Sequence, residues 1–359
     1  MPEIWLNYGM AEVVLDIRAE NLEQNVDLEG VILTDSQIEE KLSSLDFSIP
    51  IDLVVLHNSR AVQKIISSIF SLCEKKSYPF PNIFAEKHLV NLVKRGMPEG
   101  TTISEFNDEL SKANLVFLSE LELDGLFGYE TIATRLLRKF GQDYMLSAYS
   151  KRKANTPTPG QITDSIEEAR QFSDKFEIQG IEILANSKGI IDIAINHPSK
   201  TITLTKSLES IAIRDIGQQK SMIISTGKEA SNYSLSKSFS SLWNCSAAIK
   251  DNGLAILIAE CRGGLGSEAL QQYIEGRLGI EKLKNPTKYV EGMENLLYLS
   301  ETQKRFQVGL ISILPEFYTK KLNIIPLNGV KQAMEYILKT QGGRQKVTVV
   351  SDGARMLLR

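Results

Sequence analysis

Apolar residues along the chain follow two patterns that alternate with each other. Short runs of β-branched and other apolar residues are typical of strands, whereas apolar residues spaced three or four positions apart are typical of helices. The predicted strands are residues 12–17, 51–57, 115–118, 181–184, 190–195, 201–205, 222–225, 254–259, 308–314, 323–325 and 347–350. Predicted helices follow three of these strands, at residues 60–74, 235–249 and 267–278. The alternation predicts an α/β protein with mostly parallel sheets flanked by helices.

The length of 359 residues exceeds what a single hydrophobic core usually accommodates. We therefore expect two α/β domains, residues 1–205 and 206–359, with a ligand cleft between them. Whether the last segment packs back on the first domain is left open. Residues 150–161 are rich in basic residues, proline and glycine, which is typical of a linker or a long surface loop. Ser165 and Glu168 have the spacing of a capping box at the start of the following helix.

The charge balance narrows the possible partners. Lys and Arg number 41 and Asp and Glu 44, so the net charge of −3 gives no general attraction to nucleic acid or to an anionic membrane. No apolar run approaches the roughly 18 residues that cross a bilayer, and the start shows no signal-peptide pattern. Three scattered cysteines fit a reducing compartment, so a cytoplasmic location is expected.

Polar residues directly follow the predicted strand 51–57. Asn58, Ser59 and Arg60 stand where a helix begins, so backbone N–H groups and the Arg60 guanidinium could hold a phosphate or carboxylate. The alternative is an ordinary helix N-cap followed by an exposed arginine.

A glycine-rich turn follows the predicted strand 254–259. Gly263, Gly264 and Gly266 would allow a ligand to approach the backbone closely before the next helix. Their spacing is not that of a dinucleotide-binding fingerprint, and the alternative is a plain strand–turn–helix junction. No histidine lies near Cys261, so a nucleophilic role for its thiol is not expected.

The chain has three histidines, which excludes a His-rich metal cluster. His57 ends a predicted strand, and His88 enters a predicted helix at residues 89–95. By itself, such a histidine is more typical of a surface or capping position than of a catalyst. His197 is expected in a hairpin turn between two strands and is read as structural.

The order of the motifs resembles that of the nickel-dependent lactate racemase family. The N-terminal segment carries Leu6-Asn7-Tyr8-Gly9, then Val13-Val14-Leu15-Asp16-Ile17 and Glu20-Asn21-Leu22. The most specific similarity is in the C-terminal half, where 247–253 is followed by the strand 254–259, Cys261 and Gly264-Leu265-Gly266. The tail, from Gly309-Leu310-Ile311-Ser312 to Ser351-Asp352-Gly353, is also similar, so the resemblance covers nearly the whole chain.

The resemblance implies a two-domain α/β architecture and a racemase or epimerase, that is, an isomerase, acting on 2-hydroxy acids. In that family a nickel-pincer nucleotide takes a hydride from the substrate carbon and returns it to either face. Two histidines exchange the hydroxyl proton, a task that suits a pKa near neutrality. A lysine tethers the cofactor, and an imidazole completes the nickel site.

Several positions depart from the family pattern. Arg60 retains the substrate-anion position, and His88 falls on the first catalytic histidine. Asp124 stands at the second catalytic histidine, Thr134 falls near the position of the tethering lysine, and no histidine follows between Thr134 and Ser165 for nickel. Ser240 replaces a C-terminal-domain lysine, for which Lys237, one helical turn earlier, is a substitute.

Two hypotheses follow for this divergent active site. In the first, the chain is a racemase or epimerase with His88 and Asp124 as acid/base residues, which requires a raised pKa for Asp124. In the second, it is a pseudoenzyme, that is, a non-catalytic member of the same fold that binds a small molecule or acts in regulation. We expect no metal ligands and no cofactor, with the nickel-pincer nucleotide present only if the family chemistry is retained. The expected partner is a small carboxylate or phosphate in the cleft between the domains, bound by Asn58, Ser59, Arg60, Lys237, Gly263, Gly264 and Gly266.

Overall fold

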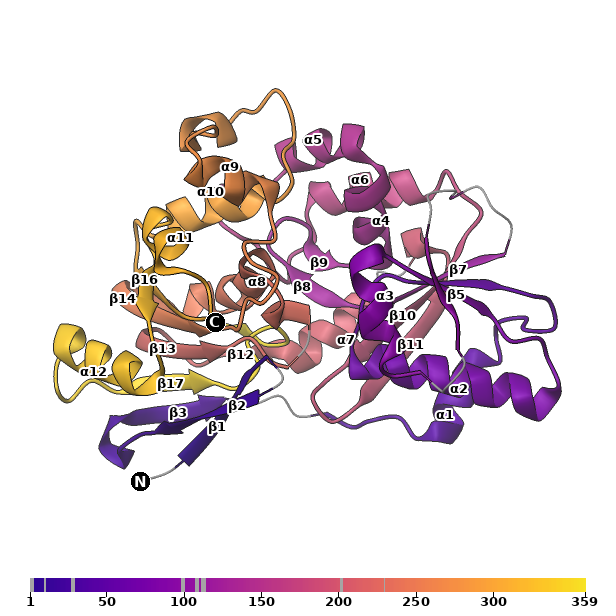
Figure 1. Ribbon diagram of the computed structural model, residues 1–359, viewed down its shortest axis with the longest axis horizontal. Coiled ribbons are helices and arrows are strands. Elements are labelled where there is room, and N and C mark those ends of the chain that lie inside the picture. Colours follow the sequence, from indigo (N-terminus) through magenta and orange to yellow (C-terminus); the bar gives the residue numbers. More distant parts are fainter. Residues whose placement is uncertain are drawn as a thin grey trace.

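The computed structural model describes residues 3–9, 11–26, 30–97, 101–106, 110, 114–200, 203–228 and 230–359. It contains two six-stranded sheets, which lie side by side in Figure 1 with the first on the right. Both sheets are built largely of parallel strands with helices against their faces, so the predicted α/β architecture is confirmed. Among the described helices, none combines the length and apolar character needed to cross a membrane.

The first sheet has the strand order β11-β10-β7-β4-β5-β6. Its strands are β4 (Asp52–Val55), β5 (Asn82–Ala85), β6 (Ile103–Glu105), β7 (Leu115–Glu120), β10 (Gln179–Ala185) and β11 (Ile190–Asn196). Only β11 pairs antiparallel to its neighbour. The associated helices are α1 (Asp35–Leu42), α2 (Arg60–Lys76), α3 (Lys87–Lys94), α4 (Ile132–Phe140), α5 (Gln142–Ser150) and α6 (Asp164–Ser173).

The second sheet has the order β16-β15-β14-β13-β17-β3, with all pairs parallel. Its strands are β3 (Leu22–Val26), β13 (Gln219–Ser225), β14 (Ile249–Ile258), β15 (Gln307–Ile311), β16 (Ile325–Leu327) and β17 (Val347–Val350). The associated helices are α8 (Leu235–Cys245), α9 (Glu268–Ile274), α10 (Met293–Thr302), α11 (Glu316–Lys321) and α12 (Val330–Gln341), whereas α7 (Thr203–Ala212) contacts β11 of the first sheet. The boundary expected at residue 205 put Leu22–Val26 in the N-terminal half, but its pairing with β17 assigns it to the second sheet.

Three short two-stranded pairings complete the fold. They are β1 (Glu3–Tyr8) with β2 (Ala11–Asp16), β8 (Glu122–Asp124) with β9 (Gly128–Glu130), and β12 (Ile213–Arg214) with β18 (Leu357–Leu358). The first hairpin packs Leu6 and Leu15 against Ile256 of the second sheet. As a result, the beginning of the chain lies against its C-terminal half (Figure 1).

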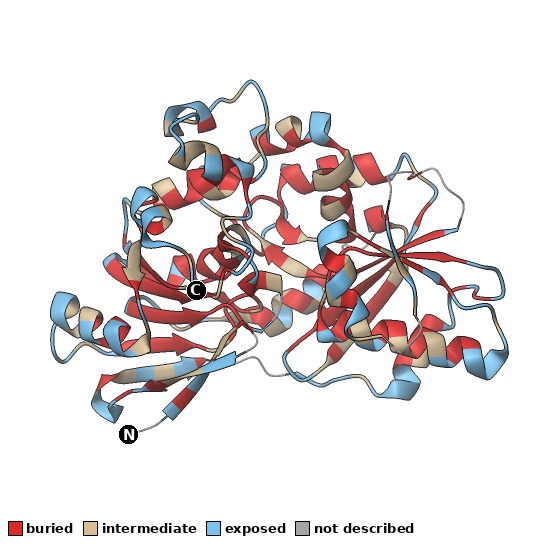
Figure 2. Ribbon diagram, viewed as in Figure 1, coloured by how far each residue is buried: buried red, intermediate tan, exposed pale blue. Residues whose placement is uncertain are grey.

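One hydrophobic cluster runs through both halves of the molecule. It contains Phe117 of β7 and Leu136 of α4 together with Phe239 of α8 and Leu257 of β14, all buried. Figure 2 shows these central strands as almost continuously buried. A separate cluster packs α1 and α2 on the other face of the first sheet. The two sheets therefore share one core, which fixes their relative placement.

Three local predictions were wrong. Residues 201–205 were expected to form a strand; residues 201 and 202 lie outside the described residues, and Thr203 starts α7, in which Leu204, Leu208 and Ala212 are buried four residues apart. His197 therefore precedes a 3-10 turn, Pro198–Lys200, rather than lying in a hairpin. The Ser165–Glu168 capping box is also absent, because α6 begins at Asp164 after an N-cap Thr163, and Ser165 Oγ donates to the carbonyl of Ala148 at 2.8 Å.

The loop at 150–161 is packed against the β8–β9 hairpin. The backbone N–H of Thr158 donates to the Gly125 carbonyl, and that of Gly160 donates to the Gly128 carbonyl, each at 2.9 Å. Gly128 has φ +81°, and an added Cβ would lie 1.8 Å from the Gln161 carbonyl oxygen. Only glycine fits at this close approach of two backbone segments.

We expect Gly128→Ala to lower the free energy of unfolding by about 2–4 kcal/mol, because overpacking adds to the strain of a positive φ. Gly217→Ala is the matched control, since Gly217 has φ +64° but no atom within 4 Å of the added Cβ. The control should lose only about 1–2 kcal/mol from the strain. Urea denaturation of both variants measures the difference, and equal losses would contradict the packing argument.

Candidate functional site

The carboxyl ends of the central strands of both sheets meet at a cavity. In the first sheet the chain order reverses between β4 and β7, and in the second it reverses between β13 and β17. Ligands of open parallel sheets bind outside the carboxyl ends of the strands at such points of reversal. The cavity has a volume of about 350 Å³ and is lined from both halves of the chain. Its lining residues are Asn7, Ile32, Leu33, Asp35, Ile38, Arg60, Ala61, Lys64, 186–190, Lys228, Asp352 and Arg355.

Basic side chains dominate the polar part of this lining, and several of them are held by carboxylates. Arg355 donates to Glu120 Oε1 at 2.9 and 3.1 Å and to Asp352 at 3.0 Å. Because Glu120 ends β7 of the first sheet, Arg355 joins the two halves at the cavity. Lys228 pairs with Glu12 at 2.6 Å.

Arg60 lies in the cavity wall at the start of α2, as the strand-end pattern suggested. The two residues before it cap the helix. Ser59 Oγ accepts the Val62 N–H at 3.1 Å, and Asn58 Oδ1 accepts from Gln63 at 3.2 Å. Their predicted anion-binding role stays a prediction, since these contacts are those of the N-cap alternative.

The other predicted residues gather at a second polar region, between α3, α4, the β8–β9 hairpin and α8. Buried His57 lies 3.6 Å from Glu122, which also pairs with Arg135. The exposed His88 has its Nδ1 3.4 Å from Glu86. Burial and the nearby charge of Lys237 lower the pKa of His88. The imidazole of His88 is therefore neutral over more of the physiological pH range than an unperturbed histidine.

Lys237 of α8, in the second half of the chain, interacts electrostatically with Arg135 and Glu122 of the first half. Its side chain reaches solvent, yet protein surrounds it on most sides, and this burial together with the charge of Arg135 lowers its pKa. Lys237 and His88 are thus brought together from distant parts of the sequence.

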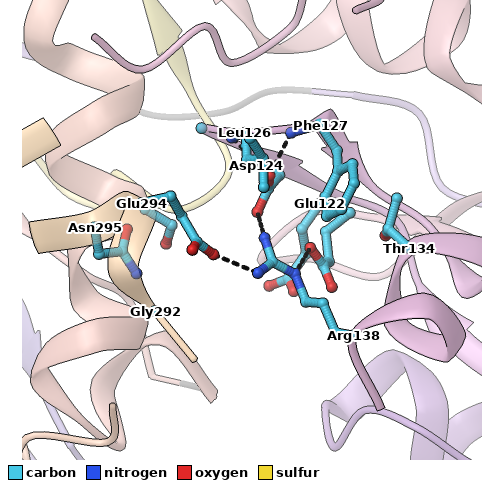
Figure 3. Close-up of polar contacts among 12 residues, drawn as sticks. Glu122, Asp124, Leu126, Phe127, Thr134, Arg138, Gly292, Glu294 and Asn295 are labelled. Atoms are coloured by element: carbon cyan, nitrogen blue, oxygen red, sulfur yellow. Dashed lines mark hydrogen bonds and ion pairs between the residues drawn. The ribbon is translucent and has the colours of Figure 1, made fainter. Parts of the chain in front are cut away.

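Asp124 is held in a turn by three donors. Its carboxylate accepts the N–H groups of Leu126 and Phe127 at 2.8 and 2.7 Å and the Arg138 guanidinium at 3.0 Å (Figure 3). Burial raises the pKa of Asp124, but the charge of Arg138 and these hydrogen bonds outweigh it, so the pKa lies below its usual value. This direction is opposite to the one that the acid/base hypothesis requires.

Arg138 is surrounded by carboxylates from three elements. It contacts Asp124 of β8, Glu130 of β9 at 3.3 Å, and Glu294 of α10, and Figure 3 shows its contacts to Asp124 and to Glu294 across the two halves. Burial, partly offset by Arg138 and reinforced by the charge of Asp124, raises the pKa of Glu130 to about 7. Sequence reasoning missed Glu130 and Glu294, because nothing in the local pattern distinguishes them from surface glutamates.

The glycine-rich turn bonds to a neighbouring loop. The Gly263 N–H donates to the Tyr233 carbonyl at 2.6 Å, and the Gly264 N–H donates to the Cys261 carbonyl at 2.9 Å. An added Cβ at Gly266 would lie 2.2 Å from Ser234 Oγ, the N-cap oxygen of α8. The turn thus supports the start of the helix that carries Lys237. Burial raises the pKa of Cys261 to about 12, so its thiol stays protonated at neutral pH.

The complete fold is similar to two solved structures. The lactate racemase apoprotein from Thermoanaerobacterium thermosaccharolyticum aligns with a TM-score of 0.75 at 13% identity, covering 100% of both chains. The chain has the lactate racemase fold. A protein from Thermotoga maritima aligns with a TM-score of 0.67 at 11% identity, covering 92% of this chain and 99% of the other. No protein-family model matches the sequence, and no curated protein does.

The fold raises the question of whether the residues present suit a nickel-pincer nucleotide. Thr134, near the expected tether position, is fully buried, and its Oγ1 accepts the Thr131 N–H at 2.8 Å as part of a helix cap. Within the described ranges, no three His, Cys, Asp or Glu side chains are grouped so that they could hold a metal ion. Thr134 offers no amine for the covalent link that a lysine would make, so the expectation of no bound cofactor stays a prediction.

Glu130→Gln tests the buried carboxyl cluster. The pKa of Glu130 is raised from 4.5 to about 7 in the folded protein, so its contribution to stability is full below pH 4.5 and is lost as the pH rises through 7. The glutamine variant removes this loss. We therefore expect its free energy of unfolding, relative to wild type, to rise by about 1–3 kcal/mol between pH 5 and pH 8.

Denaturant titrations at the two pH values measure this change. Glu275→Gln is the control, because Glu275 is exposed and the Arg277 hydrogen bond lowers its pKa. Its relative stability should show no such rise. If the free energy of unfolding changed equally with pH in wild type and Glu130→Gln, the raised pKa of Glu130 would be contradicted.

Proposed function

We propose that the protein binds a small carboxylate or phosphate in the cavity between its two sheets and does not carry out nickel-pincer chemistry. The observation that carries the proposal is the placement of five basic side chains, Arg60, Lys64, Lys188, Lys228 and Arg355, around one cavity where both sheets reverse their chain order. Basic residues at such a point favour an anionic ligand.

The contacts and positions of the basic side chains indicate what each contributes to the cavity. Arg355 is held in the cavity wall by its contacts with Glu120 and Asp352. Arg60 stands on the first turn of α2, where the positive end of the helix dipole adds to its charge. Lys228 extends from the loop after β13 and contributes a charge from the opposite half.

The absence of nickel chemistry is supported by the chain's own residues. Thr134 cannot form the covalent link of a lysine, and Asp124 is committed to Arg138 and a backbone turn. We extend the proposal to a cytoplasmic protein that binds neither nucleic acid nor membrane, because Cys73, Cys245 and Cys261 are free and buried and the net charge is small. Its oligomeric state is outside the proposal.

The second candidate function is a 2-hydroxy-acid racemase or epimerase. One observation favours it: the pKa of Glu130 near 7, beside Asp124, would allow this carboxyl to exchange a proton at neutral pH. In this version His88 would be the partner acid/base. The candidate still needs a hydride acceptor, which the residues present do not hold.

Arg60→Ala and Lys228→Ala test the anion site. With acetate and inorganic phosphate as probes in separate titration calorimetry series, we expect each variant to bind at least one probe about 10–100-fold more weakly than wild type, the loss of one charge-assisted hydrogen bond. Arg277→Ala, which removes an exposed arginine paired with Glu275, is the control and should bind like wild type. Equal affinities for all four proteins, or no binding by wild type, would overturn the proposal.

Elemental analysis and a chiral lactate assay separate the two candidate functions. We expect protein produced together with the enzymes that make the nickel-pincer nucleotide to carry neither stoichiometric nickel nor added covalent mass. We expect no lactate racemisation. Near-stoichiometric nickel together with turnover would overturn the binding-only function.

A further inference from the structure

The chain contains the dipeptide Asn-Gly at two places, and the fold surrounds them differently. Asn252-Gly253 lies within β14, whereas Asn328-Gly329 forms the bend between β16 and α12. Because glycine has no Cβ, its backbone nitrogen is the least hindered one that the side chain of a preceding asparagine can reach. The two sites therefore show how tertiary structure acts on the same pair of residues within one molecule.

Strand β14 restrains the first pair. Gly253 is buried, and a Cβ added to it would lie 2.7 Å from the carbonyl oxygen of Lys250 and 2.9 Å from that of Lys220. The N–H of Asn252 donates to the carbonyl of Arg305 at 2.6 Å. A bond between the Asn252 side chain and the Gly253 nitrogen requires the backbone to rotate, so β14 has to open locally before it can form.

The second pair lies on the surface. Asn328 is exposed, and no described atom lies within 4 Å of a Cβ added at Gly329. The N–H of Asn328 donates to Gln332 Oε1 at 2.6 Å, a contact that involves the nitrogen of Asn328 and not that of Gly329. β16 is the outermost strand of the second sheet, away from the cavity where β13 adjoins β17 (Figure 1). The bend thus has room for the rotation that β14 opposes.

We propose that Asn328 is a site of spontaneous deamidation. The nitrogen of Gly329 bonds to Cγ of Asn328, and the side-chain amide nitrogen leaves as ammonia, taking the proton of the Gly329 N–H. One water molecule then opens the resulting ring. Opening at Cγ gives aspartate, and opening at the main-chain carbonyl gives isoaspartate, whose backbone is one methylene longer. Water is the only other reactant, and no electrons are transferred. The proposal is independent of the ligand in the cavity.

The carboxylate of the aspartate product stands at the start of α12. The N-cap of this helix is Gly329, which has no side chain, and the first turn contains Lys331 and no acidic residue. A negative charge at residue 328 is favourable beside the positive end of the helix dipole. α12 packs Ala333 and Ile337 into the core of the second sheet. The aspartate product therefore has a more stable start of α12 than the unmodified chain.

Peptide mass spectrometry of the folded full chain during incubation at neutral and mildly alkaline pH measures the reaction. We expect the mass gain of amide-to-acid exchange to accumulate at residue 328 at least about 10-fold faster than at residue 252, because β14 must first open. In urea, where neither pair is structured, the two rates should be similar. Equal rates in the folded protein, no gain at residue 328, or a difference that persists in urea would overturn the proposal.

Gly329→Ala tests the role of the attacking nitrogen. The φ of 163° is extended backbone and the added Cβ has room, so the fold should be kept. The methyl group hinders the nitrogen and should slow deamidation at residue 328 at least about 10-fold. Gly343→Ala is the matched control, since its added Cβ also has no described atom within 4 Å, and it should leave the rate unchanged. An undiminished rate in Gly329→Ala would contradict the ring-forming step.

Asn328→Asp separates the charge from the chemistry. We expect its ratio of folded to unfolded protein to be about two- to fivefold higher than that of wild type at low salt, with the gain disappearing at high salt, because salt screens the helix dipole. Denaturant titrations at both salt concentrations measure the ratio. No gain at low salt would overturn the effect on α12, whereas the deamidation itself is decided by the time course at residue 328.

Discussion

A single hydrophobic core shared by the two sheets is the constraint on which the rest of the structure depends. Phe117 and Leu136 from the first half and Phe239 and Leu257 from the second are buried in one cluster, so neither half buries its apolar surface alone. This packing turns the carboxyl ends of the central strands toward one another. The cavity, the Arg355–Glu120 pair and the Arg138 cluster all lie where the halves meet.

Charge is buried at this junction in compensated groups. Arg138 contacts Asp124, Glu130 and Glu294, and one arginine cannot neutralise three carboxylates. A proton on Glu130 reduces this imbalance, in agreement with its raised pKa of about 7. The charge of Arg138 and the backbone hydrogen bonds lower the pKa of Asp124. The pKa values of the neighbouring carboxyls Asp124 and Glu130 are therefore shifted in opposite directions by their surroundings.

The chain thus has the fold of lactate racemase, but at several positions its side chains make structural contacts instead. Thr134 closes a helix cap, and Asp124 holds a turn and an ion pair. Arg60 remains beside the cavity. We therefore propose the cavity at the reversal of the chain order as the ligand site, whereas the contacts of Arg138 with Asp124, Glu130 and Glu294 join the two halves.

The sequence by itself determined the α/β class, the central strands and the position of Arg60. Buried parallel strands consist of local runs of apolar residues, and the first polar residues after such a run show where the strand ends. The sequence pattern failed at residues 201–205, where β-branched residues favour a strand, because Leu204, Leu208 and Ala212 are buried on one face of the helix that starts at Thr203. The other basic residues of the cavity could not be predicted locally, because Lys188, Lys228 and Arg355 come from loops of both sheets. Only the tertiary structure placed them together and raised the pKa of Glu130, because burial and long-range charge depend on which distant segments pack against each residue.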